Sequence, residues 1–230
     1  MGQAGRDDAS VVAQVANLRS QINNLRHTKS NLVAIGLRAK TARAIVVVLG
    51  GTIDAPRVIA KTEIRLADPK MPGTAQPYHE VMDLPWEESQ RAAQKYIRVI
   101  ESVAAKELAR LIDEQKSTGM KISGVGIVGA RDRDLARIGN NHIRAHAAEG
   151  VLFRGVLDLA ADSNLLKRRT FPDRDFDAVV ATELGAMGAA VKRKISDLSR
   201  TVPAPWRADE KQAAMAAWLV LHGPIQNRDR

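Results

Sequence analysis

The chain has 230 residues, of which 45% are hydrophobic and 27% are charged, a balance typical of a globular domain rather than a disordered segment. It contains no cysteine, which excludes disulfides, a thiolate nucleophile and cysteine-ligated zinc. A formal net charge of +9 favours anionic partners such as nucleic acid, while an aromatic content of 3% argues against a surface that stacks bases.

The apolar runs have the length of strands and are far shorter than a membrane span. The first ten residues are polar and lack the apolar centre of a signal peptide. We therefore expect a cytoplasmic protein with no membrane partner.

The first predicted element is an amphipathic helix over residues 9–27, within an N-terminal segment of residues 1–29. Its apolar residues are spaced alternately by four and three positions: Val11, Val15, Leu18, Ile22 and Leu25. Such a seam favours a parallel homodimer, although it lasts only about two heptads. Packing of this helix on its own domain is the alternative.

Three strands follow, at residues 31–37, 43–49 and 58–66, all rich in β-branched residues. Short links join them, so they should be antiparallel neighbours. A loop with four prolines then leads into a long helix over about residues 86–116, whose apolar residues repeat with a helical period.

The second half of the chain alternates strands with helices. Strands are predicted at residues 121–128 and 165–171, and helices at about 141–162, 175–199 and 208–221. An antiparallel meander joined by strands that follow helical crossovers predicts an α/β fold with a mixed five-stranded sheet of the RNase H-like type.

In this arrangement the sequence resembles the RuvC-type Holliday junction resolvases of the RNase H-like superfamily. VAIGLRAKTARAIVVV stands where that family has a first strand ending in Asp, and KISGVGIVGARD where a strand ends at a catalytic Glu. HIRAHAAEGVLFRGVLDLAADSNLLKRRTFP has the family's helix, strand and closing proline, and QAAMAAWLVLHG resembles its last helix. The resemblance implies one domain over residues 30–223, followed by a polar tail at 224–230.

The chain departs from the family at the catalytic acids. The corresponding positions hold Gly36, then Val128, Gly129 and Ala130, and finally Gln212. Two-metal cleavage of a phosphodiester needs several carboxylates, so their loss predicts a nuclease fold without nuclease activity. Asp132 and Asp134 follow the fourth strand, and we interpret them as solvated loop charges rather than shifted ligands.

The carboxyl ends of the parallel strands should meet at one edge of the sheet, together with the loops that follow them. Those loops carry six basic residues: Arg38, Lys40, Arg43, Arg131, Arg133 and Arg137. Our leading hypothesis is therefore a catalytically inactive protein that binds structured or double-stranded nucleic acid through this basic rim. The alternative is a scatter of solvated arginines.

A second set of polar residues lies at the start of the helix at 141–162. His142, His146 and Glu149 share one helix face, and two histidines with a carboxylate are typical ligands of a mononuclear zinc or iron site. A polar helix face without metal is the alternative. The leading hypothesis needs no cofactor, whereas a divalent metal belongs to a second hypothesis, an enzyme with a relocated site at His146 and Glu149.

The proline-rich loop contains Tyr78, His79 and Glu80, which can act as general acids or bases. Neighbours in an extended chain alternate in direction, so either Tyr78 and Glu80 together or His79 alone would face the site. With His146 and Glu149 they could form a metal-free catalytic pair, whereas Tyr78 could equally anchor the loop. A third hypothesis is an interaction module whose N-terminal helix recruits a partner.

Overall fold

The computed structural model describes residues 31–223. The predicted helix over residues 9–27, with its proposed dimer seam, and the tail at 224–230 lie outside this range. The homodimer therefore stays a prediction.

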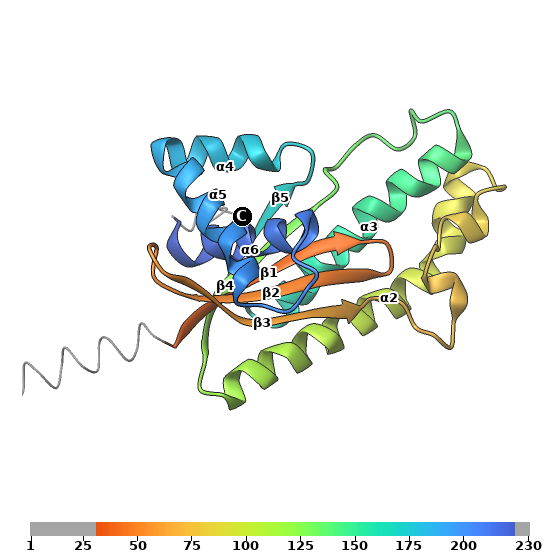
Figure 1. Cartoon of the computed structure of the whole chain (residues 1–230). Helices are drawn as coiled ribbons and strands as arrows, with labels where there is room; N and C mark the ends of the chain where they lie inside the picture. Colours follow the sequence, from red (N-terminus) through yellow and green to blue (C-terminus); the bar gives the residue numbers. More distant parts are fainter. Residues whose placement is uncertain (1–30, 224–230) are drawn as a thin grey trace, which may run out of the picture.

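The centre of the molecule is one mixed sheet with the order β3-β2-β1-β4-β5 (Figure 1). β1 pairs antiparallel with β2, which pairs antiparallel with β3, while β4 lies parallel to both β1 and β5. The strands are β1 (Leu32–Lys40), β2 (Arg43–Gly51), β3 (Pro56–Arg65), β4 (Lys121–Gly129) and β5 (Arg168–Pro172). This topology confirms the predicted RNase H-like sheet.

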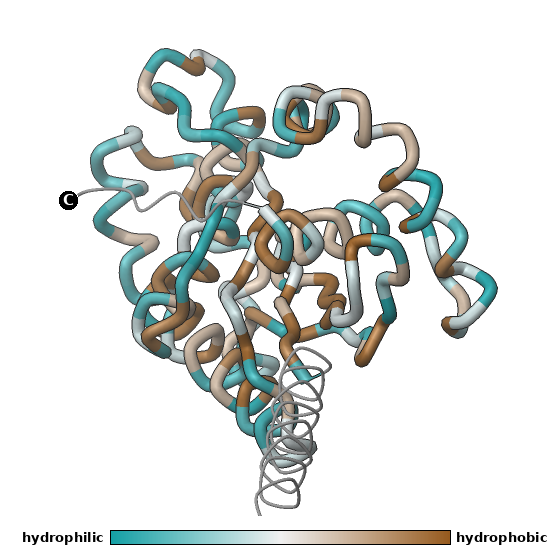
Figure 2. Tube along the Cα trace, turned by 90° about the vertical axis from the view of Figure 1, so that its left-hand side faces the viewer, coloured by the Kyte–Doolittle hydropathy of each residue, from teal (hydrophilic) through white to brown (hydrophobic). Residues whose placement is uncertain are grey.

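Helices cover both faces of the sheet and create two separate apolar cores (Figure 1). One core lies under α2 (Trp86–Ser117) and α3 (Asn141–Ser163), and the other under α4 (Phe176–Leu184), α5 (Gly188–Asp197) and α6 (Ala208–His222). The apolar segments are concentrated in the middle of the molecule (Figure 2). None of the helices in the described part of the chain combines the length and apolar character needed to cross a membrane.

The helix predicted over residues 175–199 is interrupted. Gly185 has a φ of +49°, and a short 3-10 helix, η3 (Gly185–Met187), separates α4 from α5. Glycine tolerates this left-handed backbone without steric cost, so the helix breaks there although the apolar pattern continues on both sides. A further 3-10 turn, η4 (Leu198–Arg200), follows α5.

The alanine-rich helix α6 packs unusually closely on β1 and β4. A side-chain carbon added at Gly36 would lie 1.8 Å from the Ala213 carbonyl oxygen, and one at Gly126 would lie 2.6 Å from that of Ala216. Glycine in the strands and alanine in the helix therefore let the two backbones approach directly. Gly36 also lies in the interior of β1 rather than at its end.

Candidate functional site

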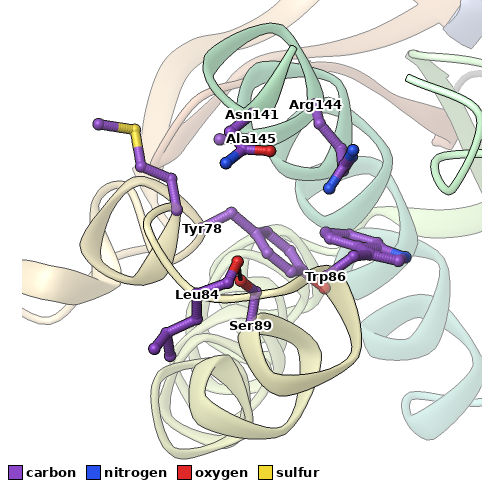
Figure 3. Close-up of a pocket in the computed structure, with 8 residues that line it drawn as sticks. Tyr78, Leu84, Trp86, Ser89, Asn141, Arg144 and Ala145 are labelled. Atoms are coloured by element: carbon purple, nitrogen blue, oxygen red, sulfur yellow. Dashed lines mark hydrogen bonds between the residues drawn. The ribbon is translucent and has the colours of Figure 1, made fainter. Parts of the chain in front are cut away.

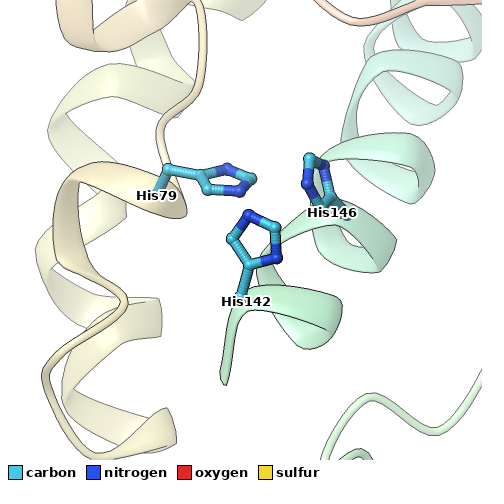
Figure 4. A group of neighbouring side chains, drawn as sticks. All are labelled: His79, His142 and His146. Carbon is cyan, nitrogen blue, oxygen red and sulfur yellow. The ribbon is translucent and has the colours of Figure 1, made fainter. Parts of the chain in front are cut away.

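Three histidines converge beside the start of α3 (Figure 4). His142 and His146 lie one turn apart on α3, where the Asn140 side chain caps the helix by accepting a hydrogen bond from the Ile143 amide at 2.9 Å. His79 comes from the short 3-10 helix η2 (His79–Val81), which lies in the proline-rich loop. The ring centroids are separated by 4.4 Å to 5.1 Å.

The geometry of these rings suits a metal ion. One ring nitrogen from each histidine lies within 4.8 Å of the other two. Tetrahedral zinc with Zn–N bonds of about 2.0–2.1 Å separates its nitrogen ligands by about 3.3 Å. Because His142 and His146 are exposed, small rotations of their side chains can close the difference.

Glu149 is almost completely buried, with 1% of its side chain exposed. One oxygen, Oε1, accepts hydrogen bonds from the Tyr78 amide at 3.2 Å and the His79 amide at 3.3 Å, and lies 2.8 Å from His79 Nδ1. Because Oε1 already accepts from two amides, we expect His79 Nδ1 to donate to it as well, which leaves His79 Nε2 available to a ligand. Glu149 therefore orients His79 and stays outside the group of three ligands.

His79 Nε2 is buried and has no hydrogen-bond partner within residues 31–223. The second oxygen of Glu149, Oε2, is also buried without a hydrogen-bond partner in this range. Buried polar atoms normally have a partner, so an unpaired nitrogen beside two other imidazoles indicates a place for a ligand.

The loop that carries His79 is held by packing against α2 and α3. The Tyr78 ring lies 5.6 Å from the Trp86 ring, and the Arg144 guanidinium lies 5.5 Å above Trp86, around a small pocket (Figure 3). The Ser89 hydroxyl donates a hydrogen bond to the Val81 carbonyl at 2.8 Å and so ties the loop to α2. Burial, and secondarily the charge of Glu149, raises the pKa of Tyr78, which suits an anchor better than a proton donor.

The neighbouring Glu80 takes no part in this group. It is exposed, and its side chain makes no hydrogen bond or ion pair within the described residues. Of the two arrangements predicted for the loop, the structure has His79 alone facing the site. His79 is the residue whose partnership with His142 and His146 the sequence did not reveal, because helical spacing connects only residues within one helix.

At the end of β1 the predicted basic rim is largely neutralised. Arg38 lies between Asp173, at 3.3 Å from Nη2, and Asp209, at 3.4 Å from Nε, and only 13% of its side chain is exposed. Lys40 Nζ lies 3.2 Å from the same Asp209. Both cations therefore belong to an internal charge network, which we call the Arg38 cluster: Arg38, Lys40, Asp173 and Asp209.

The other four predicted rim residues differ in their pairing. Arg43 binds Glu63 of β3 at 2.8 Å, and Arg137 binds Asp134 at 3.1 Å. Arg131 lies 3.7 Å from Asp175, and Arg133 has no ion-pair partner within residues 31–223. Asp132 pairs with Arg154, and the side chains of both loop aspartates are more than half exposed.

The positions compared with the family's catalytic acids hold no cluster of carboxylates. Gly36 lies beneath α6, Val128 is fully buried in the core, and Gln212 is half-buried on α6. The two carboxylates that pair with Arg38 of β1 are Asp173 and Asp209.

No protein-family model and no curated protein sequence matches the chain. The chain is similar to the solved structure of T. thermophilus RuvC in complex with a Holliday junction substrate, with 12% identity and a TM-score of 0.43. It is similar to a second Thermus thermophilus RuvC structure, with 13% identity and a TM-score of 0.42. Both similarities cover 83% of this chain and 92% of the other, and they concern the fold alone.

Proposed function

We propose that this protein is a metal-dependent hydrolase whose ion is held by His79, His142 and His146. The observation that carries the proposal is the convergence of ring nitrogens from three histidines within 4.8 Å of one another. The buried Nε2 atom of His79, which has no hydrogen-bond partner within the described residues, supports it. Zinc is the first choice, because three imidazoles with an open position are typical of catalytic zinc sites. The sequence predicted His142, His146 and Glu149 as ligands, and in this proposal His79 replaces Glu149.

The surroundings of the three histidines support a catalytic rather than a structural site. His142 and His146 are exposed, so one side of the ion would remain accessible to water and substrate. Glu149 would act as the partner that fixes the ring orientation of His79 and raises its basicity. A zinc ion bound there would lower the pKa of its water toward neutrality and supply a hydroxide nucleophile.

The direct test is metal content and affinity. We expect the purified protein to bind about one zinc per chain, and His79→Ala, His142→Ala and His146→Ala each to weaken binding by at least about a hundredfold. His222→Gln is the matched control, because His222 lies at the end of α6 and outside the histidine cluster. Cobalt substitution should give the absorption bands of a tetrahedral site. Equal zinc binding by the three variants and the control would contradict the proposal.

We also propose that the ancestral nuclease site is inactive. The close packing of α6 over Gly36 and the insertion of Arg38 between Asp173 and Asp209 support this. A protein that cleaves a four-way junction with Mg²⁺ while its three histidines are replaced by alanine would disprove it.

Nucleic-acid binding is the second candidate function, and the net charge of +9 favours it. The ion pairs of Arg38, Lys40 and Arg43 argue for a smaller contact surface than the predicted rim. Anisotropy with duplex and four-way-junction DNA should show binding that weakens steeply with salt. Absence of binding at low ionic strength would exclude this function.

A further inference from the structure

The histidine cluster adjoins a cleft of about 290 Å³. The cleft lies between the loop after β4, the first turns of α3 and the turn after β5. His146 lines this cleft and also belongs to the three-histidine group. A molecule bound in the cleft would therefore lie beside an ion held by the histidines.

The cleft carries positive charge that the protein does not compensate. Arg131, Arg133 and Arg174 line it, and no carboxylate within residues 31–223 lies at ion-pair distance from Arg133 or Arg174. The partner of Arg131, Asp175, is 3.7 Å away, and both side chains are more than half exposed. Such a pair contributes little and is easily exchanged for a ligand.

The single acid that lines the cleft does not cancel this charge. Asp173 Oδ2 accepts a hydrogen bond from Arg38 at 3.3 Å, and Oδ1 accepts one from the Arg174 amide at 2.8 Å. The negative charge of Asp173 is therefore paired with Arg38. The remaining lining is small or apolar, and includes the exposed side chain of Ile143.

We infer that this cleft binds the phosphate group of a phosphoester and holds it against the metal, an inference that rests on the function proposed above. Arginine presents a planar fork of donors that matches phosphate oxygens. Three neutral imidazoles leave the full charge of a divalent ion, which adds to that of the arginines. A carboxyl-rich site would instead repel an anion.

The corresponding reaction is hydrolysis of the ester. The water oxygen forms a bond to phosphorus, the bond from phosphorus to the alcohol oxygen breaks, and that oxygen takes the electron pair and a proton. No oxidant, reductant or second substrate is needed. The phosphate can come from a nucleic-acid backbone or from a small phosphoester, and both present the same oxygens to the arginines.

The test compares two double variants that lose the same charge. Arg133→Gln with Arg174→Gln alters the cleft, and Arg57→Gln with Arg98→Gln alters exposed arginines of β3 and α2 that have no ion pair within the described residues. Calorimetry measures inorganic phosphate binding to the zinc-loaded protein, and metal analysis measures zinc. We expect the cleft pair to weaken phosphate binding at least about tenfold with unchanged zinc content, and the control pair less than about twofold.

Two further probes distinguish the sources of phosphate. If the source is nucleic acid, duplex DNA binding should fall at least tenfold in the cleft pair and little in the control pair. If it is a small phosphoester, KM for p-nitrophenyl phosphate should rise in the cleft pair, while duplex binding falls equally in both. Equal phosphate affinity in the two pairs, or none in the wild type, would overturn the inference. If the wild-type protein binds phosphate but does not bind zinc, the metal site is disproved and the phosphate cleft is not.

Discussion

The Arg38 cluster and the histidine cluster differ in whether their members pair with one another. In the Arg38 cluster, Arg38 lies within 3.4 Å of both Asp173 and Asp209, and Lys40 lies 3.2 Å from Asp209. In the histidine cluster, His79 Nε2 is buried and has no partner in the described chain. The opposite charges of the Arg38 cluster pair with one another, although Arg38 Nε makes no hydrogen bond within the described residues. The three imidazoles have no such pairing among themselves, so the buried His79 Nε2 is suited to an external ligand.

The difference follows from chemistry as well as geometry. An arginine between two carboxylates is always charged, so it takes the place of a bound cation there. Imidazoles do not compensate one another in this way, because each neutral ring keeps one lone pair. The edge of the sheet thus combines an internal cation at β1 with a candidate cation site at α3.

The largest effect should come from restoring an acid at Gly36. An Asp side chain there would collide with the Ala213 carbonyl, which lies 1.8 Å from the position of Cβ, and would bury a charge. We expect Gly36→Asp to cost at least about 3 kcal/mol of unfolding free energy, measured by denaturant titration. Gly139→Ala, with no atom within 4 Å of its added carbon, is the control. If Gly36→Asp is as stable as the wild type, then α6 can move away from β1 and this position can hold an acid.

A smaller effect should come from Glu149→Gln, because in the proposed site Glu149 would act on the ion only through His79. Zinc stoichiometry should persist while zinc affinity falls by about tenfold to a hundredfold, measured by competition with a chromogenic chelator. The cobalt spectrum should keep its tetrahedral bands. A loss as large as that of His146→Ala, with altered bands, would instead identify Glu149 as a direct ligand.

Breaking the Arg38 cluster should affect stability but leave the metal in place. Arg38→Gln leaves Asp173 without its cation and Asp209 with Lys40 alone, and we expect it to cost about 1–3 kcal/mol of unfolding free energy. Arg43→Gln removes an exposed pair with Glu63 and should cost less than about 1 kcal/mol. Reduced zinc affinity in Arg38→Gln would mean that the two clusters are not independent.

The smallest effect concerns His222, which belongs to neither cluster. Burial lowers its pKa, and its Nε2 atom has no partner in the described chain. His222 therefore binds a proton more readily in the unfolded chain than in the folded protein. The free energy of unfolding should fall as pH decreases below about 6.5. His222→Gln should reduce that loss by a few tenths of a kcal/mol between pH 7 and 5, since the side chain is only partly buried. Identical pH profiles of melting temperature would contradict this.

Much of the fold could be predicted because its signals are local. Runs of β-branched residues mark the strands, and the length of each link constrains the direction of the next strand. The break at Gly185 was missed because apolar periodicity is unchanged across it, whereas a single backbone angle decides it.

Part of the candidate site was also visible in the sequence. His142 and His146 are one helical turn apart, so their shared face follows from helix geometry. Glu149 lies on the same face, but the sequence could not show that its oxygen would be used by the Tyr78 and His79 amides. The contact that makes Glu149 a partner of His79 comes from a loop 70 residues away.

The sequence by itself determined the α/β class, the strand order and the presence of basic residues and histidines at one edge of the sheet. Only the tertiary structure decided which of those charges are neutralised. Arg38 lies 135 residues from Asp173, and His79 lies in a loop remote from α3 in the chain. Secondary structure depends on neighbours in sequence, whereas pairing and ligand geometry depend on distances that only folding sets.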